Sequence, residues 1–210
     1  MPLRNEQVEL GRDHLANTSN EDLQPSETVM RWWWIDKFTQ FESGKFAQTV
    51  KCVSLAEEQI DDYMPGYPVM PHSLVIEGLA QTGGLLVGQL SDFKRSVVLA
   101  KISKAKFHAS PRPGDRMVYT ARLERIETDG ALVCCTVDIG SESTEKRLAD
   151  IDLYFAYFDN RDIERGQFVP AEFLRMMRVF KLYEVGIDAE GNPLQIPPHL
   201  LEAEKLALNT

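Results

Sequence analysis

The chain has 210 residues, of which 43% are hydrophobic, and it carries a formal net charge of -9. This length and apolar content fit one main domain with appendages and a sizeable core. The acidic balance argues against nonspecific binding to nucleic acid, because contacts with phosphates need a positive surface.

The first 28 residues are polar and show no clear hydrophobic periodicity, so we expect residues 1–28 to form an N-terminal arm. This stretch has no apolar leader, which argues against secretion and mitochondrial import. The three cysteines of the chain, Cys52, Cys134 and Cys135, have neither metal-ligand spacing nor the even number typical of a disulfide framework. We therefore expect a protein of the reducing cytoplasm.

The main domain is expected over residues 29–159 and begins with an aromatic strand. Residues 31–45, RWWWIDKFTQFESGK, combine aromatic residues suited to a pleated surface with a Ser-Gly turn. Alternation along a strand places Trp34 on one side and Trp33 on the other. A buried sheet is the favoured interpretation, and an aromatic surface for an acyl chain or a partner is the alternative. A second strand is expected over residues 44–55.

A proline-rich loop and a long helix come next. Residues 57–71 hold three prolines within seven residues, which excludes both a helix interior and a central strand. Residues 73–90 are apolar around most of a helical circumference, so this helix should be buried on nearly every side. Glu77 and Gln81 lie on its one narrow polar stripe. These polar side chains and four glycines argue against a membrane span.

Four further segments have the alternating pattern of strands, at 97–109, 116–127, 131–140 and 147–158. Their short connections favour antiparallel neighbours. The predicted class is therefore α+β, with a curved antiparallel sheet wrapped around one long buried helix. Residues 160–210 should form a C-terminal helical extension that packs on the domain or on a sister subunit, since 170–184 reads as an amphipathic helix.

Two segments carry a family resemblance: DYMPGYPVMPHSLVIEGLAQTGG and LAKISKAKFHASPRPGDRM. They resemble the hotdog-fold β-hydroxyacyl-acyl-carrier-protein dehydratases of bacterial fatty acid synthesis. The residues in register with the family's motifs are Pro65, Gly66, Pro68, Met70, Pro71, Glu77, Ala80, Gln81, Pro113, Gly114 and Asp115. The similarity runs from about Trp32 to Phe158. Two positions depart, because Tyr63 stands where the family has its catalytic histidine and His72 replaces the glycine after Met-Pro.

The resemblance implies a hydro-lyase that dehydrates (3R)-hydroxyacyl chains on acyl carrier protein. Such a reaction needs a base, an acid and an oxyanion donor. Glu77 suits the acid, since a carboxyl among apolar residues can keep its proton near neutrality. The His72 amide at the helix start suits the oxyanion donor. A phenol has an ordinary pKa of ~10 and is a poor substitute for imidazole, so the base is either His72 or a water linked to Tyr63.

The resemblance also implies substrate contacts and partners. The expected substrate-binding residues are Pro65, Gly66, Val69, Met70, Pro71 and Gln81. Between Lys94 and Arg116 seven basic residues face one acid, which predicts either a docking surface for an acidic carrier protein or a solvated strand face. The expected docking residues are Lys101, Lys104, Lys106, Arg112 and Arg116. A homodimer is expected, in which the loop of one subunit meets the helix of the other.

Neither a metal nor an organic cofactor is expected, because the sequence has no ligand spacing and no Gly-rich phosphate loop after a strand. Two other functions fit the same residues. The first is hydrolysis of acyl thioesters by a single carboxylate, here Glu77, and a helix N-terminus, which needs no histidine. The second is a catalytically silent paralogue that binds an acyl chain or acyl carrier protein.

Overall fold

The fold is built on one sheet and one long helix in a computed structural model that describes residues 33–140, 146–158 and 169–209. The strands are β1 (Lys37–Glu42), β2 (Phe46–Cys52), β3 (Ser96–Phe107), β4 (Arg116–Ile126), β5 (Gly130–Ile139), β6 (Lys146–Phe158) and β7 (Gly186–Ile187). The helices are α1 (Glu58–Tyr63), α2 (His72–Gln89), α3 (Pro170–Val179), α4 (Leu182–Val185) and α5 (Pro198–Ala207). The expected N-terminal arm, residues 1–28, lies outside the described residues.

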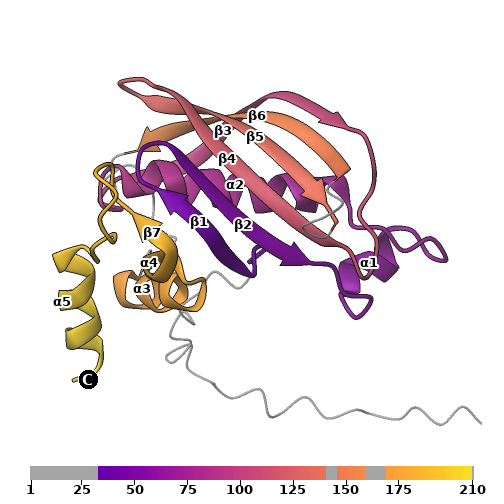
Figure 1. Cartoon of the computed structure of the whole chain (residues 1–210). Coiled ribbons are helices and arrows are strands. Elements are labelled where there is room, and N and C mark those ends of the chain that lie inside the picture. The colour runs from indigo at the N-terminus through magenta and orange to yellow at the C-terminus, as the bar shows by residue number, and fades with distance from the viewer. Residues whose placement is uncertain (1–32, 141–145, 159–168, 210) are drawn as a thin grey trace, which may run out of the picture.

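The sheet has the order β3-β6-β5-β4-β2-β1-β7 and curves around α2 (Figure 1). All its neighbouring strands are antiparallel except β1 and β7. Alternation along β6 sends Ala149, Ile151, Leu153 and Phe155 into the core beneath the sheet. Asp150, Asp152 and Tyr154, which lie between them, face outward. The predicted α+β class and the four long strands are confirmed. This curved antiparallel sheet around one long helix is the hotdog fold.

Glycines let α2 lie close to the sheet. A Cβ on Gly78 would lie 2.5 Å from Cζ of the buried Tyr119 ring, so only glycine leaves room for that ring. One turn further along α2, the Thr82 hydroxyl lies 2.7 Å from the Thr49 hydroxyl on β2, which satisfies two buried polar groups. The helix was predicted to be buried on nearly every side, and its exposed side chains, Ser73 and Glu77, both lie on the predicted polar stripe.

Two local predictions for the main domain were wrong. The strand expected over 31–45 begins only at Lys37, and residues 33–36 form an irregular segment. This segment nevertheless buries Trp34, which is 6% exposed. The expected loop over 57–71 contains α1, which ends at Tyr63 just before the first of the three prolines.

The C-terminal extension packs on the edge of the sheet formed by β1. In Figure 1 α3, α4 and β7 gather beside β1, and α5 lies beyond α3. The predicted amphipathic helix over 170–184 is broken at Lys181, whose φ of 63° is left-handed, so α3 and α4 are separate. β7 pairs with β1 in parallel and adds a strand that the sequence pattern did not predict. The other edge of the sheet, β3, is exposed along almost its whole length.

Candidate active site

The proline-rich loop leads directly into the N-terminus of α2. Backbone amides of Leu74 and Val75 bond to the Pro71 carbonyl at 3.0 and 3.2 Å, so the amides of His72 and Ser73 precede the internal hydrogen bonding of the helix. Pro71 is the N-cap and has no side chain that could accept a bond from them. These amides and the positive end of the helix dipole can therefore stabilise negative charge on a ligand.

Glu77 lies on the second turn of α2 with an exposed side chain, so the expectation of a carboxyl enclosed by apolar residues does not hold in the single chain. Gln81, one turn further, donates from Nε2 to Oε1 of Glu77 at 2.9 Å. The Oε1 atom of Gln81 accepts a bond of 2.8 Å from the backbone N–H of Trp34. A backbone N–H can face only the oxygen of an amide, so Trp34 fixes which end of Gln81 faces Glu77. The carboxylate is thus held in one orientation while its surface stays open to a ligand.

The His72 ring contacts β3 and the residues after it rather than Glu77. Its ring stacks on Phe107 of β3, with centroids 3.9 Å apart and planes within 2°, and its Nε2 lies 3.1 Å from Oγ of Ser110. A spacing of five residues also rotates two side chains by about 140° around a helix and separates them by about 7.5 Å along it. The structure therefore does not bring the His72 ring and the Glu77 carboxylate of one chain together.

Tyr63 is the last residue of α1, and its side chain is 56% exposed. The loop that follows is anchored at its far end, where the Met70 amide bonds to the Pro111 carbonyl at 2.8 Å. At its tip the Arg112 guanidinium lies over the Tyr67 ring, 4.7 Å from the centroid, and donates to the Tyr67 hydroxyl. The loop between Tyr63 and α2 is therefore fixed to the β3–β4 connection rather than free.

Apart from Gln81 on α2, the predicted substrate-binding residues divide into two groups. Pro65 and Gly66 are exposed at the tip of the loop, where Gly66 takes a left-handed φ of 79°. Val69, Met70 and Pro71 are buried in the chain's own core. The first group can touch a ligand directly, whereas the second anchors the loop.

The predicted docking residues lie along the exposed edge of the sheet and the turn after it. Lys101, Lys104 and Lys106 are all exposed on β3, Arg112 lies in the turn and Arg116 opens β4. The register sets Lys104 opposite Asp152 and Lys106 opposite Asp150 on β6. Directly paired residues share a face of the sheet, so these aspartates reduce the positive charge that was counted along the sequence.

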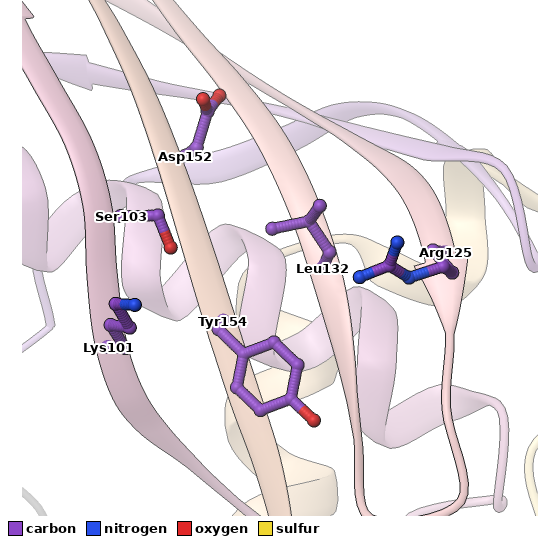
Figure 2. A pocket seen from close by; sticks show the side chains of 6 residues that line it. All are labelled: Lys101, Ser103, Arg125, Leu132, Asp152 and Tyr154. Carbon is purple, nitrogen blue, oxygen red and sulfur yellow. The ribbon is translucent and has the colours of Figure 1, made fainter.

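A hollow lies on the outer face of the sheet, away from α2 (Figure 2). It is lined by Lys101, Ser103, Arg125, Leu132, Asp152 and Tyr154. The Tyr154 hydroxyl at its rim shares its proton between the carboxylates of Glu127 and Asp129, at 3.0 and 3.2 Å. Desolvation, followed by these two hydrogen bonds, raises the pKa of Tyr154 to about 12. Lys101 alone of the predicted site residues lines this hollow, which is separate from the loop and Glu77.

Two features of the site were not predicted from the sequence. The Trp34–Gln81 bond joins residues 47 positions apart, and the His72–Phe107 stack joins the helix start to β3. No local pattern indicates either contact, because each depends on how the sheet folds over α2.

Across the described ranges, no helix has the length and apolar content needed to cross a bilayer. The same residues contain no group of three His, Cys, Asp or Glu side chains placed to hold a metal ion.

The curated proteins similar to this chain include two FabZ dehydratases. The 3-hydroxyacyl-acyl-carrier-protein dehydratase FabZ of Sulfurovum sp. (strain NBC37-1) is 31% identical over 126 residues, which cover 57% of this chain and 82% of that protein. The FabZ dehydratase of Latilactobacillus sakei subsp. sakei (strain 23K) is 36% identical over 94 residues, covering 44% of this chain and 67% of that protein.

Comparison with solved structures finds smu.793 from Streptococcus mutans UA159 bound to acetyl CoA, with a TM-score of 0.49 and 14% identity over 68% of this chain and 98% of that one. The dehydratase heterocomplex ApeI:P from Xenorhabdus doucetiae has a TM-score of 0.49 and 12% identity over 65% and 88% of the two chains.

The FabA-like domain family matches residues 27–151, more than half of the chain. The protein therefore belongs to the FabA-like domain family.

Proposed function

We propose that the protein is a hydro-lyase that removes water from (3R)-hydroxyacyl chains bound to acyl carrier protein. The observation that carries this proposal is an exposed carboxylate, Glu77, oriented by Gln81 on a helix whose first amides are unbonded within the helix. Acid and oxyanion donor then stand on one rigid element. The FabZ relatives, which are described as 3-hydroxyacyl-acyl-carrier-protein dehydratases, support the same substrate class.

The proposed reaction uses Glu77 as the acid. Its carboxyl proton passes to the β-hydroxyl as the carbon–oxygen bond breaks, and water leaves. A base removes the α-proton, and the electron pair of that C–H bond forms the carbon–carbon double bond. Negative charge that develops on the thioester oxygen is stabilised by the His72 amide at the start of α2. The proton taken by the base is returned to Glu77 before the next cycle.

Two groups compete for the role of base. His72 has an imidazole, but its ring stacks on Phe107 and faces Ser110 rather than the Glu77 of its own chain. Tyr63 is exposed at the position where the resembling family has its histidine, and it can hold a water molecule by its hydroxyl. In the family that the chain resembles, the loop of one subunit meets the helix of the other, so the proposed base comes from a second copy of the chain, whose loop would approach the Glu77 helix.

A homodimer formed through β3 would supply that second copy. β3 is the free edge of the sheet, and Leu99 and Ile102 pair with the core residues Phe155 and Leu153 across β6. They therefore face the same side as α2, yet they are 36% and 44% exposed in the single chain. A second β3 strand and its helix would cover them and would bring the loop of one copy toward the helix of the other.

The carrier protein is proposed to dock on the basic residues near the loop. Lys101 and Arg112 remain exposed, while Lys104 and Lys106 are partly balanced by the aspartates of β6. The expected contribution is to the rate of association rather than to a large binding energy, because exposed charges are screened by salt.

Thioester hydrolysis is the second candidate function. Its support is Tyr63, which stands where the resembling family has the imidazole used for dehydration. The two groups that remain, an exposed carboxylate and a helix N-terminus, are those that hydrolysis needs. Glu77 would then take a proton from water as the water attacks the thioester carbonyl, and the same amides would stabilise the tetrahedral oxyanion. As the carbon–sulfur bond breaks, that proton would pass to the departing carrier thiol.

One assay separates these functions. The purified protein is incubated with 3-hydroxyacyl and saturated acyl thioesters on acyl carrier protein, and the products are separated by mass spectrometry. Enoyl product from the hydroxyacyl substrate supports dehydration, and free carrier thiol from either substrate supports hydrolysis. Binding of the acylated carrier with no product would overturn both and would leave a binding protein without catalysis.

A further inference from the structure

One residue of the C-terminal extension contacts the chain on both sides of Trp34, the residue that holds Gln81. Phe180, at the end of α3, sets its ring edge-on against Trp33, with centroids 4.8 Å apart and planes at 72°. Its carbonyl accepts a 2.8 Å bond from the backbone N–H of Phe38. Trp34, which lies between these two contacts, donates its backbone N–H to Gln81. Phe180 is 3% exposed, so it is fixed by the core around it.

The segment from Trp33 to Asp36 needs such external contacts because it belongs to no strand. Its far end is tied to β2, where Asp36 donates its amide to the Val50 carbonyl at 2.7 Å and accepts the Cys52 amide at 2.8 Å. The Trp33 end is held against the extension instead. Phe180 therefore helps to fix the direction of the Trp34 N–H from the side opposite to β2.

We propose that Phe180 is a positioning residue for Glu77, acting through Trp34 and Gln81. This inference rests on the proposed function for its catalytic consequence. The path runs from the Phe180 ring to Trp33, from the Trp34 N–H to Oε1 of Gln81, and from Nε2 of Gln81 to the Glu77 carboxylate. The extension lies outside residues 27–151, the part matched by the FabA-like domain family. In this chain, the added helices would thus orient the acid of the family site.

The path has a specific energetic consequence. If Trp34 turns away, Gln81 loses the bond that fixes which end of its amide faces Glu77. The carboxylate then samples several rotamers, and the productive one becomes less populated. A displacement of about 1 Å at a reacting group can cost about 100-fold in rate, so a partial loss of order is expected to lower kcat by roughly tenfold. Substrate contacts of the loop are untouched, so KM should change little.

The test is a double-mutant cycle between Phe180→Ala and Gln81→Leu. The exchange of the Trp34 amide proton is measured by nuclear magnetic resonance, and kcat and KM are measured with a 3-hydroxyacyl thioester. Each single variant should speed Trp34 exchange and lower kcat. In the Gln81→Leu background, Phe180→Ala should have no further effect on kcat, because residues that act through one another are not additive. Phe180→Leu, which retains more apolar volume, serves if the alanine variant fails to fold.

A matched control removes a buried side chain from the same extension. Leu200→Ala is in α5, which packs on α3, and should lower stability while leaving kcat and Trp34 exchange unchanged. Unchanged Trp34 exchange in Phe180→Ala, or effects on kcat that multiply in the double variant, would overturn the positioning role. A wild-type protein that forms no enoyl product would refute the proposed function instead, and the exchange measurement would still decide the link from Phe180 to Trp34.

Discussion

The Gln81 side chain donates to the Glu77 carboxylate across 2.9 Å, one turn apart on the exposed side of α2. This relationship gives the carboxylate a fixed direction without enclosing it. An acid that must meet a substrate needs both properties, since a fully buried group would be unreachable and a free one would be disordered. The remaining surface of Glu77 is open in the single chain, where a ligand or a second copy can approach it.

Glu77→Gln is expected to abolish dehydration, because the amide has no acidic proton to give to the leaving hydroxyl. A loss of at least about 100-fold in kcat is expected for a general acid. The free energy of unfolding should stay within about 0.5 kcal/mol of wild type, since Glu77 is exposed. Enoyl formation and thermal unfolding measure the two effects. Undiminished turnover would remove Glu77 from the mechanism.

Tyr63→His is expected to raise the rate of dehydration. The substitution restores imidazole at the loop position where the resembling family has its base, and the exposed site can accept the smaller ring. We expect a gain of about tenfold or more in kcat, within the usual contribution of a positioned base. His72→Gln in the otherwise wild-type protein is the control. If Tyr63→His leaves the rate unchanged while His72→Gln abolishes turnover, His72 is already the base.

Ile102→Asp is expected to convert a homodimer into a monomer. Ile102 is on the α2 side of the free edge strand β3, where the proposed partner would bury it, and a buried carboxylate without a partner is costly. Light scattering measures the molar mass. The matched control is Ile126→Asp, at the end of β4, where the isoleucine is 56% exposed. A wild-type protein that is monomeric would refute the proposed dimer outright.

Much of the fold could be predicted because long elements have clear periods. The alternation in 147–158 predicted the strand β6, and the apolar run of 73–90 predicted α2 to within one residue at each end. β7 could not be predicted, since two residues carry no period and the strand exists only because β1 offers an edge. The short helix α1 was hidden for a similar reason, because the neighbouring prolines dominated the pattern.

The site was predictable where it is local and unpredictable where it depends on packing. The spacing of four residues placed Glu77 and Gln81 on one face of a helix, and the structure joins them. The sequence could not show that Trp34 holds Gln81, because the two residues are 47 positions apart. Nor could it show that Glu77 is exposed, since apolar residues surround it along the sequence whether they face the core or another subunit.

Gly78→Ala is expected to destabilise the protein by about 1–3 kcal/mol, the usual cost of overpacking a core. The added methyl would lie 2.5 Å from Cζ of Tyr119, whose ring is fully buried and cannot move aside. Gly84→Ala is the control on the same helix, because its methyl would meet the Phe155 ring at an ordinary 3.4 Å. Chemical unfolding should show Gly84→Ala to be neutral or stabilising. Equal stability of the two variants would contradict the packing argument.

Asp150 on the outer face of β6 should make the protein less stable in acid. A hydrogen bond from His108, 2.8 Å away, and one from Arg147 at 2.7 Å lower the pKa of its carboxyl below the ordinary 3.8. The unfolded chain therefore binds more protons than the folded one just below pH 4, so this contribution is present above about pH 4 and is lost as the pH falls through the lowered pKa. This contribution should be no more than about 1 kcal/mol, since the groups are partly exposed.

Asp150→Asn removes the charge, so the difference in free energy of unfolding between wild type and variant should shrink from pH 6 to pH 3. A difference that stays constant over this range would show that the ion pairs with Asp150 do not contribute to folding.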